Sequence, residues 1–422
     1  MFHSLCAIFI LSYLLFINNT HAVTWTNWGK NQQSNPHEIF YPESREEIVH
    51  IIKQAHEKNL TVRAYGSGHS WSNVACTDGY LINTDKLNKI LSVDTKNRLV
   101  KIEGGIKIKD LKTQLKEHNL DLQNFGSDTI QSMAGAIATA THGTGQTGTY
   151  SDFIEEIELI TADGNDVTLS PTSYPNLFAA ARVNIGCLGI VYALTIRCKK
   201  LREHRLMFIK TDFDEVMTNY KKLRTDHKYF SFFWCPYTNG IVIGHLLNHL
   251  LKKKLKENKQ PKITFIKGSP QFSAKKNHPS FDYHFESEIA VPMDSLPQAL
   301  VEIQKIFPLY EQEGFTLLRP VSVRFAQAES ATYLSPAVDQ DVAYLCFSTP
   351  PEEQYFALFK DVEEQLYKLG GRPHWGKINF LTHEKVKELY GENLDKFLAA
   401  KKRLDPHGMF SNEFTKRVLD GE

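Results

Sequence analysis

Residues 66–72 read Gly-Ser-Gly-His-Ser-Trp-Ser and follow a strand-like stretch, Thr-Val-Arg-Ala-Tyr, at residues 61–65. Glycine adopts backbone conformations that other residues avoid, so two glycines at the end of a strand allow a tight turn and a close approach to a ligand. On these residues alone His69 has two interpretations: it binds a ligand, or it is a hydrogen-bonded turn histidine. The flanking sequence has to decide between them.

Around this turn the chain alternates between helix and strand patterns. The helix patterns, with apolar residues at helical spacing, are residues 46–58 and 108–118. The strand patterns are residues 61–65, 99–102, 154–161, 167–169 and 188–196. Ala-Asp-Gly at 162–164 joins two of these strands as a hairpin. Because the strands are short and their order is irregular, the prediction is an α+β domain and not a βαβ series.

A second glycine cluster, residues 143–148, matches the dinucleotide fingerprint G-x-G-x-x-G. That fingerprint must follow a strand and open a helix, so that a pyrophosphate meets the helix N-terminus. Here small residues precede it and a strand pattern follows at Ile154, which argues against a Rossmann site. A different phosphate cradle built from backbone amides stays open.

Composition narrows the class of protein. The chain has 422 residues, of which 42% are hydrophobic, with 49 Lys and Arg against 48 Asp and Glu. These values are ordinary for a folded chain of two domains and exclude a disordered protein. A net charge of +1 offers no electrostatic basis for binding nucleic acid.

Six cysteines are too few and too scattered for a disulfide scaffold, and no C-x-x-C spacing indicates a metal or redox site. Without Cys6, which lies in the N-terminal segment, five thiols are left, and we expect them to be core residues. They are Cys76, Cys187, Cys198, Cys235 and Cys346.

Two segments bear on localisation. Residues 5–17 are an apolar run shorter than the roughly 20 residues of a membrane span, and Ala22 is suited to cleavage before Val23. We therefore expect residues 1–22 to be a cleaved export signal, with an uncleaved N-terminal anchor as the alternative. The lysine-rich residues 252–267 could be a membrane-surface or anion-binding patch, or an exposed loop between strands.

Read together, several ordered motifs resemble a known family. They are residues 66–72, Asn124 to Ser127 with Met133 to Gly135, Thr141 to Gly145, Phe232 to Tyr237, Leu334 to Ala337, Arg372 to Lys377 and Asp405 to Phe410. They are similar, in this order, to motifs of the sugar and aldonolactone oxidases in the vanillyl-alcohol-oxidase (PCMH) type of flavoproteins. That family includes gulonolactone, arabinonolactone and alditol oxidases, and the likeness covers nearly the whole chain.

This resemblance implies an FAD-binding domain of two α+β subdomains that is interrupted by an α+β cap domain over the flavin. The implied boundaries are residues 23–204 for the FAD domain, 205–375 for the cap, and 376–422 for a segment that returns to the FAD domain.

The resemblance also implies a cofactor site. His69 would bond through Nδ1 to the flavin 8α-methyl group and hold FAD covalently. The backbone of the glycine turn and of residues 132–145 would surround the pyrophosphate. Residues 186–190 would lie near the adenosine end, and their alternative is a strand and turn of the core. The implied FAD contacts are Gly66, Ser67, Gly68, His69, Ser70, Gly126, Ser132, Gly135, Thr139, His142, Gly143 and Ile190.

Two neighbours in the chain have separate implied roles. A small residue at the position of Gly126 gives oxygen room to approach the flavin, which favours an oxidase, although Gly126 could be a plain turn glycine. Ser127 matches a contact to a substrate hydroxyl, and its alternative is a solvent-facing serine.

Catalysis in the family moves a hydride to flavin N5 while a nearby group removes the hydroxyl proton. Relatives often carry Glu-x-Arg on a cap strand, and here Arg324 is present but Ser322 replaces the glutamate. A serine hydroxyl is no general base near neutral pH unless another group activates it. Cys346 replaces a polar residue of some relatives and could line the substrate site.

Three interpretations of this departure are open. Lys377 could be the base, since a desolvated lysine next to Arg324 would have a lowered pKa. Ser322 could instead fit a different substrate, or turnover could be poor or absent. On a regular strand His374 would point away from Lys377, so we do not expect it to be catalytic.

The resulting expectation is an FAD-dependent oxidoreductase acting on a CH–OH group of a sugar, aldonolactone or alditol. Oxygen would be the acceptor and hydrogen peroxide the product. The alternatives are a dehydrogenase with another acceptor and a non-catalytic protein that binds flavin.

Overall fold

The computed structural model describes residues 23–202, 206–237, 242–247 and 283–421. The export-signal prediction for residues 1–22 and the membrane-patch prediction for residues 252–267 therefore lie outside the described residues. Within the described part of the chain, no helix is long and apolar enough to cross a membrane.

The glycine turn follows a small parallel sheet of three strands. Its strands, in spatial order, are β3 (Glu38–Phe40), β5 (Tyr80–Asn83) and β4 (Val62–Tyr65). Helix α2 (Arg45–Glu57) packs against this sheet through Ile48, Ile51, Ile52 and Ala55, the four apolar positions of the predicted helix. It begins at Ser44, whose side chain accepts a hydrogen bond from the backbone of Glu47, the usual way to satisfy a free helix amide.

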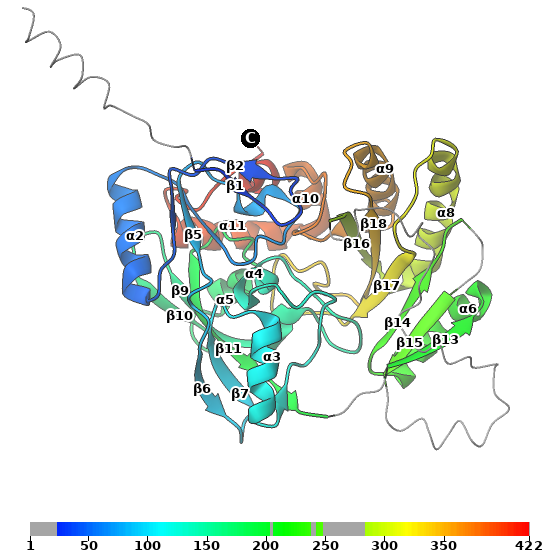
Figure 1. The fold of residues 1–422 in the computed structure, drawn as a ribbon, viewed down its shortest axis with the longest axis horizontal. Helices are drawn as coiled ribbons and strands as arrows, with labels where there is room; N and C mark the ends of the chain where they lie inside the picture. The colour runs from blue at the N-terminus through cyan, green and yellow to red at the C-terminus, as the bar shows by residue number, and fades with distance from the viewer. Residues whose placement is uncertain (1–22, 203–205, 238–241, 248–282, 422) are drawn as a thin grey trace, which may run out of the picture.

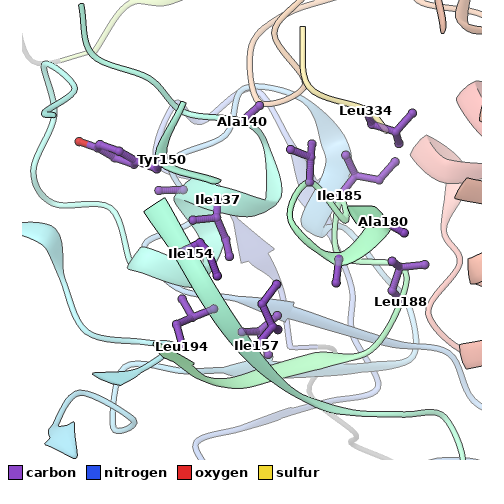
Figure 2. Packing of buried hydrophobic residues seen from close by; sticks show 14 of the residues in the cluster. Ile137, Ala140, Tyr150, Ile154, Ile157, Ala180, Ile185, Leu188, Leu194 and Leu334 are labelled. Carbon is purple, nitrogen blue, oxygen red and sulfur yellow. The ribbon is translucent and has the colours of Figure 1, made fainter. Parts of the chain in front are cut away.

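A five-stranded antiparallel sheet forms the second part of this region. In spatial order its strands are β10 (Asp166–Leu169), β9 (Ile154–Ile160), β11 (Ile190–Arg197), β7 (Leu99–Glu103) and β6 (Ile90–Asp94). The predicted hairpin is confirmed, because β9 and β10 pair directly. Helices α3 (Ile108–Glu117), α4 (Met133–Ala138) and α5 (Pro175–Ala181) contribute to the hydrophobic core on this sheet (Figure 2).

A seven-stranded antiparallel sheet forms the rest of the molecule. In spatial order its strands are β13 (Leu206–Thr211), β15 (Val242–Leu247), β14 (Phe230–Trp234), β17 (Val321–Ala326), β18 (Val342–Thr349), β16 (Phe285–Pro292) and β19 (Arg372–Pro373). Helices α6 (Phe213–Asp226), α8 (Leu296–Gln312) and α9 (Tyr355–Tyr367) lie on the side of this sheet away from the rest of the molecule (Figure 1).

Alternation along the strands gives this sheet two different faces. One face carries residues such as Val323, Leu345 and Ile289, which form a hydrophobic core with α6, α8 and α9. The other face carries the residues in between, which we call the polar face. They are Glu286, Glu288, Ser322, Arg324, Tyr344, Cys346 and Ser348.

The C-terminal segment packs against the first part of the chain, next to the glycine turn (Figure 1). It contains α10 (His383–Tyr390), α11 (Glu392–Leu404), α12 (Glu413–Thr415) and a final π-helical turn, Lys416–Asp420. The backbone amide of Val62 donates to the carbonyl of Met409 at 2.8 Å, and the side chain of Asn412 donates to three carbonyls of residues 73–76.

Short strand pairs complete the structure. They are β1 (Trp25–Thr26) with β2 (Gln33–Ser34), and β8 (Leu120–Asp121) with β12 (Lys199–Lys200). The mixed helix and strand content confirms the predicted α+β class. The domain boundaries at 204/205 and 375/376 stay predictions.

Candidate functional site

An open cleft lies along the glycine turn that follows β4 and holds about 620 Å³ of space outside the protein atoms. It runs between this turn, helix α4 and the turn at Gly186. The predicted cofactor residues that line it are Gly66, Ser67, Gly68, His69, Ser70, Ser132, Gly135 and Thr139. The chain thus brings residues 66–70 and 132–139 together around one space.

The glycines of this turn are required by its geometry. Gly68 has φ of +60°, in the left-handed region that residues with a Cβ rarely adopt. A Cβ on Gly66 would lie 2.0 Å from the Oγ of Ser132, so only glycine lets the turn approach the start of α4 this closely. The backbone at this end of the cleft is therefore open to a ligand.

His69 lies at one end of the cleft and is 7% exposed. Its ring stacks on Trp28, with ring centres 4.4 Å apart, and meets Trp71 edge-on. Burial lowers its pKa to about 4, so the imidazole is neutral at neutral pH. Its Nε2 atom is buried without a hydrogen-bond partner among the described residues.

Arg63 ties the far side of the cleft together. Its guanidinium, 1% exposed, donates to the carbonyls of Gly186, Ile185 and Phe410 at 2.8, 2.9 and 2.6 Å, and also to that of Val74. Burial lowers its pKa to about 10, which still leaves it charged. One side chain thus joins β4, the turn at Gly186 and the C-terminal segment.

Four predicted cofactor residues do not line the cleft. Ile190 is 1% exposed and packs in the core with α2, in line with the strand-and-turn alternative, and its place near the adenosine end stays a prediction. Gly143 packs against Asn124, since a Cβ there would lie 2.1 Å from its Oδ1. Gly126 bonds through its amide to the hydroxyl of Tyr150, and His142 belongs to the polar face instead.

On the polar face, three residues form one row across neighbouring strands. Glu288 on β16 pairs with Cys346 on β18, which pairs with Ser322 on β17. In the next row Arg324 donates a hydrogen bond to the Oγ of Ser127, 197 residues earlier in the chain. The structure therefore brings the predicted substrate contact Ser127 and the predicted catalytic Arg324 into direct contact.

Lys377 is bonded to a residue that the sequence did not single out. Its ammonium forms an ion pair with Glu286 on β16 and lies 4.2 Å from the centre of the Trp71 ring. Burial alone would lower its pKa, but the negative charge of Glu286 outweighs burial and raises the pKa above its ordinary value. The predicted lowered pKa is wrong, because the nearest charged partner of Lys377 is a carboxylate and not Arg324.

The condition under which His374 would point away from Lys377, a regular strand, is not met. Strand β19 ends at Pro373, and the chain then turns, with the amide of Lys377 donating to the carbonyl of His374 at 3.0 Å. Gly376 makes this turn fit, since a Cβ there would lie 3.1 Å from Ser70 and 3.2 Å from Thr139. His374 and Lys377 therefore lie near the same polar residues.

The two nearby histidines have different partners. Nδ1 of His142 faces the carbonyl of Gly143 at 2.8 Å and must donate to it, while Nε2 faces Glu288 at 3.3 Å. Burial opposes the charge of Glu288, but the contact with His142 and the charge of Lys377 lower its pKa to about 2, so Glu288 is a carboxylate at neutral pH. His374 accepts the amide hydrogen of Gly376 on Nδ1, and burial lowers its pKa to about 3.

The five described cysteines are free thiols, but only two of them are core residues. Cys187 and Cys198 are buried, whereas Cys76, Cys235 and Cys346 are half-buried, so the expectation of five core thiols is wrong for these three. Burial and the two glutamates raise the pKa of Cys346 well above its ordinary value, which keeps this thiol neutral on the polar face. The described residues contain no group of three or more potential metal ligands.

The residues missed from the sequence share one pattern. His284, Glu286 and Glu288 alternate with Phe285, Ser287 and Ile289 in the stretch 284–289. Polar residues at every second position predict a strand with one polar face, and this signal could have identified them. Their place beside Ser322 and Lys377 depends on sheet pairing, which the pattern does not contain.

The residues of the cleft fit FAD. A glycine turn with open backbone, the N-terminal side of α4 and a neutral histidine with an unpartnered nitrogen are what a flavin dinucleotide needs for its pyrophosphate and ring. Next to His69, the contacts of Trp71 lead directly to the polar face: its amide donates to the carbonyl of Gly376 and its indole to that of His284. A cofactor in the cleft would thus end at the polar face.

Comparison with known protein families gives two matches. Residues 36–170 match the FAD binding domain family, and residues 277–418 match the D-arabinono-1,4-lactone oxidase family. Among solved structures, cholesterol oxidase from B. sterolicum superimposes with a TM-score of 0.75 at 17% identity, over 94% of this chain and 96% of that chain. This likeness establishes the fold.

Curated relatives match over nearly the whole length. L-gulono-1,4-lactone dehydrogenase of Mycobacterium tuberculosis is 30% identical over 94% of this chain and 99% of that protein. L-gulonolactone oxidase of Scyliorhinus torazame is 30% identical over 95% and 99%, and that of Bos taurus is 28% identical over 96% and 100%. The chain therefore has the vanillyl-alcohol-oxidase type of fold and belongs to the family of FAD-dependent aldonolactone oxidases and dehydrogenases, enzymes that act on CH–OH donors.

Proposed function

We propose that this enzyme oxidises a CH–OH group of an aldono-1,4-lactone and passes the electrons to oxygen. The observation that carries the proposal is the contact between Arg324 and Ser127, which places a cation and a hydroxyl together on the polar face. A small polyhydroxylated ring needs such groups to bind its hydroxyls. The relatives named above act on lactones of this kind.

Bound FAD would supply the hydride acceptor. Arg324 and Lys377 are two fixed cations near the place where negative charge develops on the substrate oxygen, so they stabilise that charge and lower the pKa of the bound hydroxyl. Lys377 acts as a cation and not as the base, because its ion pair keeps it protonated. Ser322 and Cys346 are neutral and set the shape of the polar face beside Glu288.

Anaerobic mixing tests the substrate. L-gulono-1,4-lactone and D-arabinono-1,4-lactone, with alditols for comparison, should bleach the flavin absorbance in a single turnover. Admission of air should restore the absorbance and release hydrogen peroxide. If no lactone or alditol reduces the flavin, the proposed substrate class is wrong.

The electron acceptor has a second candidate. The mycobacterial relative is named a dehydrogenase, and the space at Gly126 is limited, because a Cβ there would lie 3.3 Å from the carbonyl of His142. Re-oxidation of the reduced flavin by a quinone or dye that is much faster than by air would favour this alternative. Comparable or faster re-oxidation by air favours the oxidase.

We further propose that FAD is attached covalently to His69. The neutral imidazole at the end of the cleft supports this, because only an unprotonated nitrogen can act as a nucleophile. After acid precipitation the yellow chromophore should stay with the protein, and His69→Ala should release it. Free flavin from the unmodified protein would refute the covalent link.

We also propose that the protein is exported, with residues 1–22 as a cleaved signal. This proposal rests on the apolar run at residues 5–17 and on Ala22. N-terminal sequencing of the protein from its native source should begin at Val23. A chain that still begins at Met1 and sediments with membranes would support an uncleaved anchor instead.

A further inference from the structure

We infer that Glu286 is a positioning residue, which holds the Lys377 ammonium charged and fixed beside the flavin-binding cleft. The inference deepens the proposed function, since it concerns a cation that this function uses. The sequence motifs do not contain Glu286, which lies 91 residues before Lys377 and meets it only in the folded chain.

Both carboxylate oxygens of Glu286 have partners. Oε2 bonds to Lys377, while Oε1 accepts hydrogen bonds from Nε2 of His284 at 3.0 Å and from Oγ of Ser348 at 3.1 Å. These donors come from the residue just before β16, from β18 and from the turn after β19. Because each oxygen is held, the carboxylate has one fixed orientation, and it presents one oxygen to Lys377.

Lys377 in turn is held on two sides. The Glu286 carboxylate lies at its ammonium, and the Trp71 ring lies 4.2 Å away. Its side chain is 14% exposed, so water does little to solvate the charge. An ammonium in this position depends on its carboxylate, since burial without a partner favours the neutral amine.

The other groups that face Lys377 do not replace Glu286. Glu288 on β16 is paired with His142, and the thiol of Cys346 on β18 is neutral. His374 on its own turn and His69 at the cleft are neutral, because burial lowers their pKa to about 3 and about 4. Glu286 is the carboxylate in direct contact with the ammonium.

The test uses Glu286→Gln, which keeps the shape of the side chain and removes its charge. Anaerobic flavin reduction by L-gulono-1,4-lactone is measured from pH 6 to pH 10 in the unmodified and the variant holoenzyme. The unmodified enzyme should show no loss of rate that is due to Lys377 in this range. In the variant the rate of flavin reduction should fall at alkaline pH. A buried lysine without a partner loses its proton at a pH that is lower by on the order of 2 to 4 units.

Lys377→Arg in the Glu286→Gln background provides the rescue. A guanidinium stays charged at every pH used. The rate of this double variant should therefore not fall at alkaline pH, even where its absolute rate is lower. Glu302→Gln is the matched control, because Glu302 pairs with Lys305 on the surface of α8, and it should leave the profile unchanged. A pH profile of Glu286→Gln that equals that of the unmodified enzyme would overturn the inference.

A second measurement does not depend on turnover. In Glu286→Gln the melting temperature should rise relative to the unmodified protein between pH 7 and pH 10, because over this range the folded lysine has lost a proton that the unfolded lysine still carries. Adding Lys377→Met should abolish this dependence. If the unmodified enzyme is not reduced by any lactone, the proposed function fails while this measurement still decides the role of Glu286. If Glu286→Gln does not fold, Glu286→Asp replaces it in these measurements, and the expected change in the pKa of Lys377 is then smaller and of the same sign.

Discussion

The cofactor cleft and the polar face meet at Trp71, yet they are built in different ways. The cleft is lined by backbone and small residues, with glycines that permit close approach and a positive φ at Gly68. The polar face is built from buried charges that hold one another, such as Glu286 with Lys377 and Glu288 with His142. Backbone suits the binding of a cofactor, whereas fixed charges suit an oxygen atom whose charge changes during the reaction.

The largest effect should follow from removing a cation of the polar face. Arg324→Met should lower the rate of anaerobic flavin reduction by about 10³-fold or more, because the charge that stabilises the substrate oxygen is lost while FAD stays bound. Stopped-flow absorbance measures this rate. Arg319→Met, which alters an exposed arginine just before β17, is the control. A rate close to that of the unmodified enzyme would show that the polar face is not where substrate binds.

A buried pair of the polar face should matter for stability. Glu288→Gln leaves the buried His142 without its carboxylate partner and should lower the free energy of unfolding by about 3 kcal/mol, as seen when one partner of a buried pair is removed. Urea unfolding at pH 7 measures this. Glu413→Gln removes an exposed partner of Lys416 and should cost less than about 1 kcal/mol.

The pH dependence of the same pair has a definite sign. The pKa of Glu288 is lowered from 4.5 to about 2, so its stabilising contribution is present above pH 5 and is lost as the pH falls toward 2. The difference between Glu288→Gln and the unmodified protein should therefore shrink over this interval. A constant difference would mean that the carboxylate is not charged in the folded protein.

A substitution at Gly126, between the two regions, should slow the re-oxidation of the flavin and not its reduction by substrate. Gly126→Ala places a methyl group 3.3 Å from the carbonyl of His142 and 3.5 Å from the hydroxyl of Tyr150. Re-oxidation of the reduced flavin by air should become about tenfold slower, equivalent to about 1.4 kcal/mol of barrier. Flavin reduction by the lactone is the internal control and should change little. Equal slowing of both steps would argue against oxygen access at Gly126.

The smallest effect should follow from a glycine of the cleft. Gly68→Ala puts a Cβ on a residue with φ of +60°, which costs about 1 to 2 kcal/mol, and it should also lower the FAD content. Gly314→Ala is the control, because Gly314 also has a positive φ, of +88°, and no atom within 4 Å of its Cβ position. It should cost similar stability and keep full FAD. Equal FAD loss in both variants would mean that the cleft is not especially dependent on its backbone.

Local patterns predicted local structure well. The helix at residues 46–58 and the hairpin around 162–164 follow from periodicity and turn residues, and both are confirmed as α2 and as β9 with β10. The glycine turn and His69 could be placed at a ligand site because their motif is contiguous. Such features depend on residues a few positions apart, where sequence spacing fixes spatial distance.

The polar face could not be predicted in the same way. Its composition depends on β16, β17 and β18 lying side by side, and the contact between Arg324 and Ser127 spans 197 residues. The predicted shift of the Lys377 pKa had the wrong sign for the same reason, because the sign of the shift depends on which charge is nearest in space. The alternation at residues 284–289 indicated a strand with a polar face, but not its neighbours.

The guanidinium of Arg63 has a consequence for how the chain is made. It joins β4 to Phe410 across 347 residues, and the neighbouring Val62 bonds to Met409. At about 5 to 20 residues per second, synthesis of that interval takes roughly 20 to 70 s. The N-terminal half must wait that long before residue 410 is made, and until then Arg63 lacks one of its four carbonyl acceptors. Capture of the cofactor is therefore expected to be a late, post-translational event, and the nascent chain a substrate for chaperones until then.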